Sequence, residues 1–167
     1  MKKLLKILPL VFILCFIISC QHGEKVTEQA TANIESEKVK VQLILNQYIK
    51  ALTTKNMELL SEIFAQDEDI VMFDGNISER FVGWEALKGR FQEHFNSFEK
   101  LDITFKELDI KVHAFGEVAW LSSILDANLL NQGQQGSISG LRVTWVLEKR
   151  NQNWVIVHAH FSLPQVK

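Results

Sequence analysis

Cysteine is nearly missing from this chain. The 167 residues include two cysteines, Cys15 and Cys20, and none follows residue 20. No disulfide can therefore form within residues 21–167, even in a compartment that would allow one. This part of the chain must be held together by packing, and the apolar residues, which make up 47% of the sequence, can supply a core.

Positive charge and the common catalytic motifs are also scarce. Lysine and arginine number 18 against 20 aspartates and glutamates, and they form no basic patch of the kind that binds nucleic acid. The sequence has no Gly-rich phosphate loop, no recognisable pair of nucleophile and base, and no cluster of metal-ligating residues. Nucleic-acid binding is therefore not expected, no metal or cofactor is implied, and whether the protein is an enzyme stays open.

The one long apolar run is at the N-terminus. Residues 1–19, MKKLLKILPLVFILCFIIS, place Lys2, Lys3 and Lys6 before an apolar stretch, which is the layout of a secretory signal peptide. The apolar stretch, residues 7–18, is shorter than the ~20 residues that a membrane-spanning helix needs. Removal of this signal would leave 15 basic and 20 acidic residues, a net charge of −5.

The run ends in IISC, which resembles a bacterial lipobox with Cys20 as the modified residue. The resemblance implies cleavage before Cys20 and acylation of its thiol and its new amino group, which would anchor the protein to a membrane. Because Gln21 follows instead of aspartate, the resemblance implies the outer membrane of the bacterial cell envelope. The alternative is an ordinary signal peptide that ends near a cysteine. Residues 20–35 are expected to form a polar, flexible tether between the lipid anchor and the domain that follows.

Residues 36–167 are expected to form one domain whose first half is mostly helical. Apolar side chains recur there at helical spacing. The expected helices are residues 36–52, 57–64 and 83–98. Ser36 is expected to cap the first of them. The segment DIVMF, residues 69–73, is predicted to be a strand that ends in a turn at Asp74–Asn76.

The second half of the chain has the alternating pattern of strands. The expected strands are residues 101–112, 118–130, 138–147 and 154–162. The apolar positions change parity near Lys106–Glu107, which indicates a β-bulge that curves the sheet. The polar segment of residues 131–136 is expected to be a loop. This order predicts an α+β fold, in which a curved, mostly antiparallel sheet wraps around three N-terminal helices as a cone with a cavity.

Four segments resemble the SnoaL-like branch of the nuclear-transport-factor-2-like (NTF2-like) superfamily. They are QYIKALTTKNMELLSEIF, FVGWEALKGRF, LRVTWVLEK and WVIVHAHFS, in the order and spacing of the family. The resemblance implies the cone fold that is also found in ketosteroid isomerases. Because the superfamily includes isomerases, cyclases, dehydratases and non-enzymatic dimerisation domains, the resemblance implies no single activity.

The last predicted hairpin raises the question of His158 and His160. If it turns symmetrically about Asn151–Gln152, His158 faces Trp145, and alternation places all three side chains on the outer face of the sheet. There they could form a dimer interface, line a pocket or bind a metal. A metal site needs a third ligand, and His113 is the only other histidine on a strand. A bulge in this hairpin would exchange the two faces.

The same register places Arg142 on the face that packs against the helices. A buried charge without a partner is costly, so Arg142 is expected to bind either a carboxylate, such as that of Glu148 or Asp74, or an anionic ligand. Aromatic side chains often line apolar pockets, and several aromatic residues are candidates here. One of them, Trp84, could equally pack the third helix against the sheet. The candidate pocket residues are Arg142, Phe73, Trp84, Trp120 and Phe161.

The resemblance to ketosteroid isomerases implies two catalytic candidates. Tyr48 matches the tyrosine that donates to the oxyanion, and Asp74 matches the general base if two residues are inserted near Glu68. The second acid of those enzymes would fall near Ser139, where this sequence has no carboxyl group. Steroid isomerisation is therefore not expected, while a simpler acid–base reaction stays open. Both residues also have structural interpretations, Tyr48 in the core and Asp74 in a turn.

Three functions are consistent with the sequence. The first is the binding of an unknown small molecule, mostly apolar or anionic, in the cavity of an envelope protein that contacts the membrane through its lipid alone. The second is an acid–base isomerase or hydrolyase that uses Tyr48 and Asp74. The third is a non-catalytic module that dimerises with a second copy of itself through the apolar outer face.

Overall fold

The computed structural model describes residues 33–75 and 79–164, so the expected signal peptide and the Cys20 anchor lie outside the described residues. Its helices are residues 33–53, α2 (Met57–Ile63) and α3 (Trp84–Asn96). The chain is already helical at residue 33, so Ser36 lies inside the first helix and does not cap it. None of the helices in the described ranges is long and apolar enough to cross a membrane.

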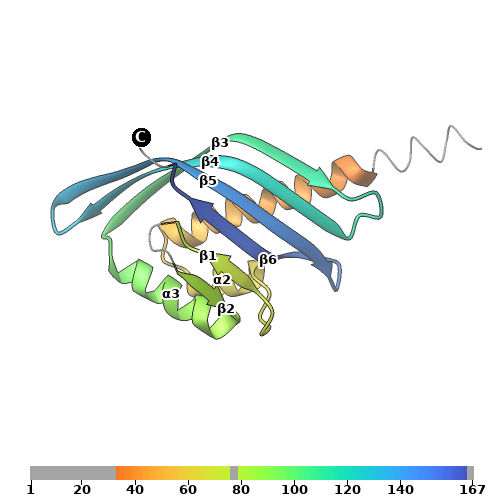
Figure 1. Cartoon of the computed structure of the whole chain (residues 1–167), viewed down its shortest axis with the longest axis horizontal. Helices are drawn as coiled ribbons and strands as arrows, with labels where there is room; N and C mark the ends of the chain where they lie inside the picture. The colour runs from red at the N-terminus through yellow and green to blue at the C-terminus, as the bar shows by residue number, and fades with distance from the viewer. Residues whose placement is uncertain (1–32, 76–78, 165–167) are drawn as a thin grey trace, which may run out of the picture. The chain divides into compact units, whose positions relative to one another are not determined.

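Six strands form one sheet. They are β1 (Val71–Phe73), β2 (Arg80–Val82), β3 (Lys100–Val112), β4 (Val118–Asn131), β5 (Gln134–Arg150) and β6 (Asn153–Ser162). Their order is β2-β1-β6-β5-β4-β3, and every pair is antiparallel except β1 and β6. Figure 1 shows the long strands β3 to β6 curving over the helices. The predicted α+β fold with a curved sheet is therefore confirmed.

Two local features differ from the sequence prediction. The short strand β2 was not expected, and it pairs with β1 at the edge of the sheet. The expected polar loop of residues 131–136 is a tight turn at Gln132–Gly133, and both flanking strands extend toward it. The backbone φ angles of Gln132 and Gly133 are 49° and 74°, a left-handed pair that suits a two-residue hairpin turn.

The sheet bends at three bulges, of which the sequence indicates one. The predicted bulge lies between Lys106 and Asp109 of β3. The second lies opposite Asp126, whose Oδ1 accepts hydrogen bonds from the Gly140 amide (2.9 Å) and the Ser139 hydroxyl (3.0 Å). The third is in β6, where Val157 has no partner between Ile156 and His158. Bulges increase local twist and bend a strand, so together they give the sheet the curvature that surrounds the helices.

The core lies between the inner face of the sheet and the helices. Its largest side chains with almost no exposed surface include Trp145, Phe64, Leu45, Leu60, Leu121 and Ile156. Full burial of each such side chain contributes about 1.5–3 kcal/mol. Packing on this face is thus the main source of stability in a domain without a disulfide.

Glu37 connects the beginning of the first helix to the β5–β6 hairpin. Its carboxylate is 3% exposed and accepts bonds from the Trp154 indole N–H (2.8 Å), Lys149 Nζ (2.7 Å) and Lys40 Nζ (2.8 Å). Burial alone would raise the pKa of Glu37, but the bonds from Lys149, Lys40 and Trp154 outweigh it and lower the pKa to about 2. Glu37 is therefore a fully bonded buried charge.

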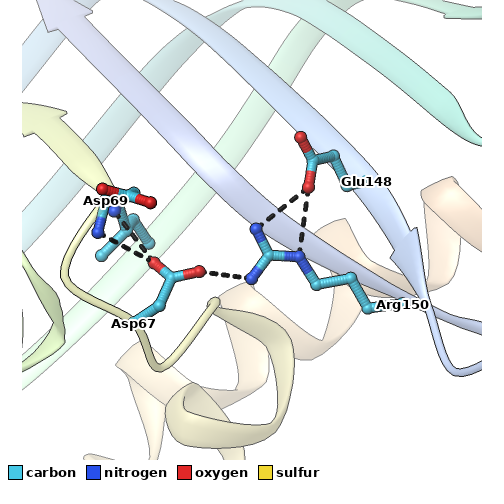
Figure 2. Close-up of polar contacts among 5 residues, drawn as sticks. Asp67, Asp69, Glu148 and Arg150 are labelled. Carbon is cyan, nitrogen blue, oxygen red and sulfur yellow. Dashed lines mark hydrogen bonds and ion pairs between the residues drawn. The ribbon is translucent and has the colours of Figure 1, made fainter.

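A second ionic cluster holds the segment before β1 against the end of β5 (Figure 2). The Arg150 guanidinium binds Asp67 and donates to Glu148 Oε2 at 3.1 Å and 3.0 Å. The other oxygen of Asp67 accepts from the amides of Asp69 and Ile70 at 3.2 Å and 3.1 Å. The bond from Arg150 lowers the pKa of Asp67. These contacts set the path by which the chain enters β1.

We expect Glu37→Ala to lower the free energy of unfolding by about 3 kcal/mol, because the variant leaves the Lys149 ammonium and the Trp154 indole N–H without their acceptor. Urea denaturation followed by tryptophan fluorescence would measure this loss. The folded pKa lies below the unfolded value of about 4.5. The contribution should therefore be present above about pH 4.5 and disappear as the pH falls toward 2.

Lys40→Ala is the matched control, since the Lys40 side chain is 50% exposed. Its loss should cost at most about 1 kcal/mol, as for a surface ion pair. Equal losses in the two variants would contradict the importance of the buried bonds.

Candidate ligand-binding site

A cavity of about 110 Å³ lies between the helices and the inner face of the sheet. Most of its wall is aliphatic or aromatic, and its polar groups are contributed by three elements. The lining apolar residues are Leu52, Met72, Phe91, Leu101, Ile103, Leu125, Ala127, Leu129, Ile138, Leu141, Phe161 and Leu163. The lining polar residues are Tyr48, Asp74, Arg90 and His94. This combination of an apolar wall and a few polar groups is typical of small-molecule sites.

Tyr48 is positioned by the aromatic core around it. It lies in the first helix, and its ring contacts Trp145 edge-on at 4.8 Å between centroids and Phe64 at 6.2 Å. Burial and the negative charge of Asp74 raise the pKa of Tyr48 well above its usual value of 10. The phenol is therefore neutral at pH 7 and can donate a hydrogen bond into the cavity.

Asp74 follows directly after β1, and the next residue explains its position. A Cβ added at Gly75 would lie 2.8 Å from the Leu141 side chain and 2.9 Å from the Phe161 backbone. Only glycine therefore allows the chain to pass so close to β5 and β6 at this point. This close approach holds the Asp74 carboxylate at the wall of the cavity.

Arg90 of α3 reaches Asp74 across the cavity wall. Its Nε donates to Asp74 Oδ2 at 2.7 Å, and its Nη1 lies 3.7 Å from Glu93 Oε2. The side chains of Arg90 and Asp74 are only 14% and 18% exposed. The pair is thus largely shielded from solvent, where the attraction between charges is stronger than at the surface.

His94 lies one helical turn after Arg90, and its ring packs against Phe98 at 5.1 Å. Burial, followed by the positive charges of Arg90 and Lys55, lowers the pKa of His94, although Asp74 opposes this effect. The imidazole is therefore neutral at pH 7 and can either donate or accept. The sequence prediction missed Arg90 and His94, although their spacing of four residues beside the buried Phe91 was a visible signal.

The predicted site residues divide between the cavity and other places. Tyr48, Asp74 and Phe161 line the cavity. Trp84 is buried in the core, where it stacks on Phe64 at 6.4 Å, and it is not part of the cavity wall. Trp120 lies on the outer face of the sheet and is 45% exposed, so its predicted pocket role is wrong.

Phe73 also lies outside the cavity. It is 39% exposed, and its ring contacts His158 and His160 at 6.0 Å and 5.5 Å between centroids. β1 pairs with β6 in parallel, so Phe73 lies next to His160 on the outer face. The prediction that Phe73 lines the pocket is therefore wrong as well.

The bulge at Val157 corrects the predicted faces of the last hairpin. Because Val157 is unpaired, His158 pairs with Val146, and Ala159 takes the place opposite Trp145. Trp145 is consequently fully buried on the inner face, and Arg142 is exposed on the outer face, where it donates to the Leu163 carbonyl at 3.2 Å. The sequence prediction placed Trp145 on the outer face and Arg142 on the inner face, so both assignments were wrong.

His158 and His160 lie on the outer face of the sheet, away from the cavity. Burial and the neighbouring His160 lower the pKa of His158. The structure contains no group of three potential metal ligands within residues 33–75 and 79–164. A role of the histidines in an interface with a second copy remains a prediction.

Ser139, at the position implied for a second acid, is also on the outer face, where it donates to Asp126. The strongest effect on Asp126 comes from Lys106, which together with Gly140 and Ser139 lowers the pKa of Asp126 to about 2. Asp126 therefore stabilises the bulge and does not contribute to the cavity.

The comparisons with known proteins agree with the fold described above. Residues 41–165 match the model of the SnoaL-like domain family. No curated protein matches the sequence. Among solved structures, an NTF2-like superfamily protein from Salmonella enterica serovar Typhimurium is similar, with a TM-score of 0.72, 19% identity and coverage of 80% of this chain and 94% of that one.

Two further structures show the range of this fold. A proposed dehydratase of the NTF2-like family from Streptomyces avermitilis has a TM-score of 0.71 and 13% identity, with coverage of 79% of this chain and 99% of that one. The association domain of C. elegans CaMKII has a TM-score of 0.63 and 16% identity, with coverage of 77% and 97%. Such low identities establish the fold and not the activity. Its fold is that of NTF2-like proteins. Because the family model spans most of the sequence, the chain belongs to the SnoaL-like domain family.

Proposed function

We propose that this protein binds a small, mostly apolar molecule in the cavity and orients one polar group of that molecule through Tyr48 and His94. The observation that supports this most directly is a mainly apolar cavity of about 110 Å³ with these polar groups in its wall. For comparison, an apolar protein cavity of about 150 Å³ accommodates benzene. A ligand no larger than about one six-membered ring is therefore expected.

A second candidate function, acid–base catalysis, is favoured by the presence of Tyr48 and Asp74 in one cavity. The Asp74 carboxylate would remove a proton from the carbon next to a carbonyl group, and the C–H electron pair would form the double bond of an enolate. The negative charge would develop on the oxygen, which the Tyr48 hydroxyl would stabilise by a hydrogen bond. Return of the proton from Asp74 to a carbon of the enolate would complete an isomerisation or exchange.

A third candidate, association with a second copy, rests on the outer face of the sheet. Phe73, Val118 and Trp120 are each about 40% exposed there, and Phe73 contacts the two histidines. The structurally similar CaMKII domain is named for association. An apolar face of this kind is typical of a contact surface.

Ligand binding can be tested with cyclohexanone and the full-length chain. We expect chemical-shift changes confined to cavity methyl groups such as those of Leu125 and Ile138, with a Kd of about 1 mM, which corresponds to ~0.6 kcal/mol for each of the seven heavy atoms. Ala127→Leu fills the cavity and should abolish these changes. Arg142→Ala, on the outer face, should leave them unaltered. Binding that survives Ala127→Leu would contradict the proposed location.

Catalysis can be tested by proton exchange. In D₂O, the protein should accelerate the replacement of the α-protons of cyclohexanone by deuterium, which NMR follows directly. Tyr48→Phe and Asp74→Asn should each slow this exchange by about 10²-fold or more. If the exchange rate in the presence of the wild-type protein equals that of buffer, the acid–base candidate is wrong and binding alone remains.

Self-association can be tested by sedimentation of the full-length chain. A dimer through the outer face should dissociate in Trp120→Glu, because that variant would bury an unpaired charge in the contact. A wild-type chain that sediments as a monomer at about 100 μM would exclude a stable dimer.

A further inference from the structure

The cavity contains balanced charges. Asp74 and Arg90 are the two charged side chains among its described lining residues, and they neutralise each other through the 2.7 Å ion pair. The other two polar residues are uncharged near pH 7, since burial raises the pKa of Tyr48 and lowers that of His94. A ligand therefore enters a site without net charge.

An anionic ligand would meet an unfavourable arrangement. To reach the Arg90 guanidinium it must displace Asp74 or lie beside its carboxylate, and like charges at such distances repel strongly. A second carboxylate, that of Glu93, lies 3.7 Å from Nη1, although its side chain is 74% exposed and solvent weakens its effect. The anion would also lose its hydration among aliphatic side chains, a cost that no free cation of the described cavity wall offsets.

A neutral hydrogen-bond acceptor finds the opposite situation. Within residues 33–75 and 79–164, no hydrogen bond engages the Tyr48 hydroxyl, so its donor is available to a ligand. The His94 imidazole lies in the same wall and can donate a second bond. A carbonyl, ether or hydroxyl oxygen satisfies both groups without bringing a charge into an apolar site.

We propose that Asp74 is a specificity-determining residue: by holding Arg90 in an ion pair, it makes the cavity selective for neutral ring compounds with a hydrogen-bond acceptor and excludes carboxylates of the same size. This proposal rests on the proposed binding function and decides between the apolar and anionic ligands that the sequence leaves open.

Three probes of similar size test the proposal with the full-length chain: cyclohexanone, cyclohexanecarboxylate and cyclohexylammonium. In the wild type, the ketone should bind at least about tenfold more tightly than either ion, as judged by shifts of the cavity methyl groups. Asp74→Asn keeps the shape of the side chain, removes its charge and releases Arg90. In this variant the carboxylate should gain at least about tenfold in affinity.

A matched control and an independent variant complete the design. Glu93→Gln makes the same acid-to-amide change on a side chain that is 74% exposed, and it should alter carboxylate affinity by less than about threefold. Arg90→Gln leaves the Asp74 charge in place, so this variant should gain affinity for cyclohexylammonium instead. It provides a separate test if Asp74→Asn does not fold.

The outcomes separate this inference from the binding function. The selectivity proposal is overturned, while binding stands, if cyclohexanecarboxylate binds the wild type as tightly as cyclohexanone does. It is also overturned if Asp74→Asn gains no affinity for the carboxylate and Arg90→Gln gains none for the ammonium ion. If no probe shifts any cavity methyl group of the wild type, the binding function fails and the inference fails with it.

Discussion

A single unpaired residue in β6 decides which side chains face the helices. Val157 interrupts the alternation between Ile156 and His158, so residues on both sides of it present apolar groups to the core. Trp154 and Ile156 before the bulge, and Ala159 and Phe161 after it, are all buried on the inner face. Without the bulge, one half of the strand would turn its apolar side chains toward solvent, because the period of a strand is two.

The cavity depends on the same curvature. A flat sheet would close against the helices, whereas a sheet bent at three bulges leaves a space that the aliphatic side chains of β3, β4 and β5 line. Gly75 then brings the end of β1 against β6 and places Asp74 at the wall. Backbone irregularities thus position the polar groups of the site.

The fold was predictable because helical and alternating periods are long-range patterns that single errors do not erase. The inner and outer faces of the last hairpin were not predictable, because both faces of β6 are apolar before the bulge. Trp154 and Ile156 alternate with Val155 and Val157, and either set of side chains suits a core. Tyr48 and Asp74 were found through a resemblance. Arg90 was missed because a charged residue on an amphipathic helix is usually solvated, and its partner lies 16 residues earlier on a different element.

The ion pair between Asp74 and Arg90 is better explained by what the cavity admits than by stability. Two largely buried charges lose much of their hydration, and well-packed apolar side chains in their place would often give an equal or more stable domain. Such side chains would, however, also remove the polar wall that distinguishes one small ring compound from another. A paired aspartate and arginine keep the site neutral while retaining polar atoms, and that combination restricts ligands by charge without restricting them by shape.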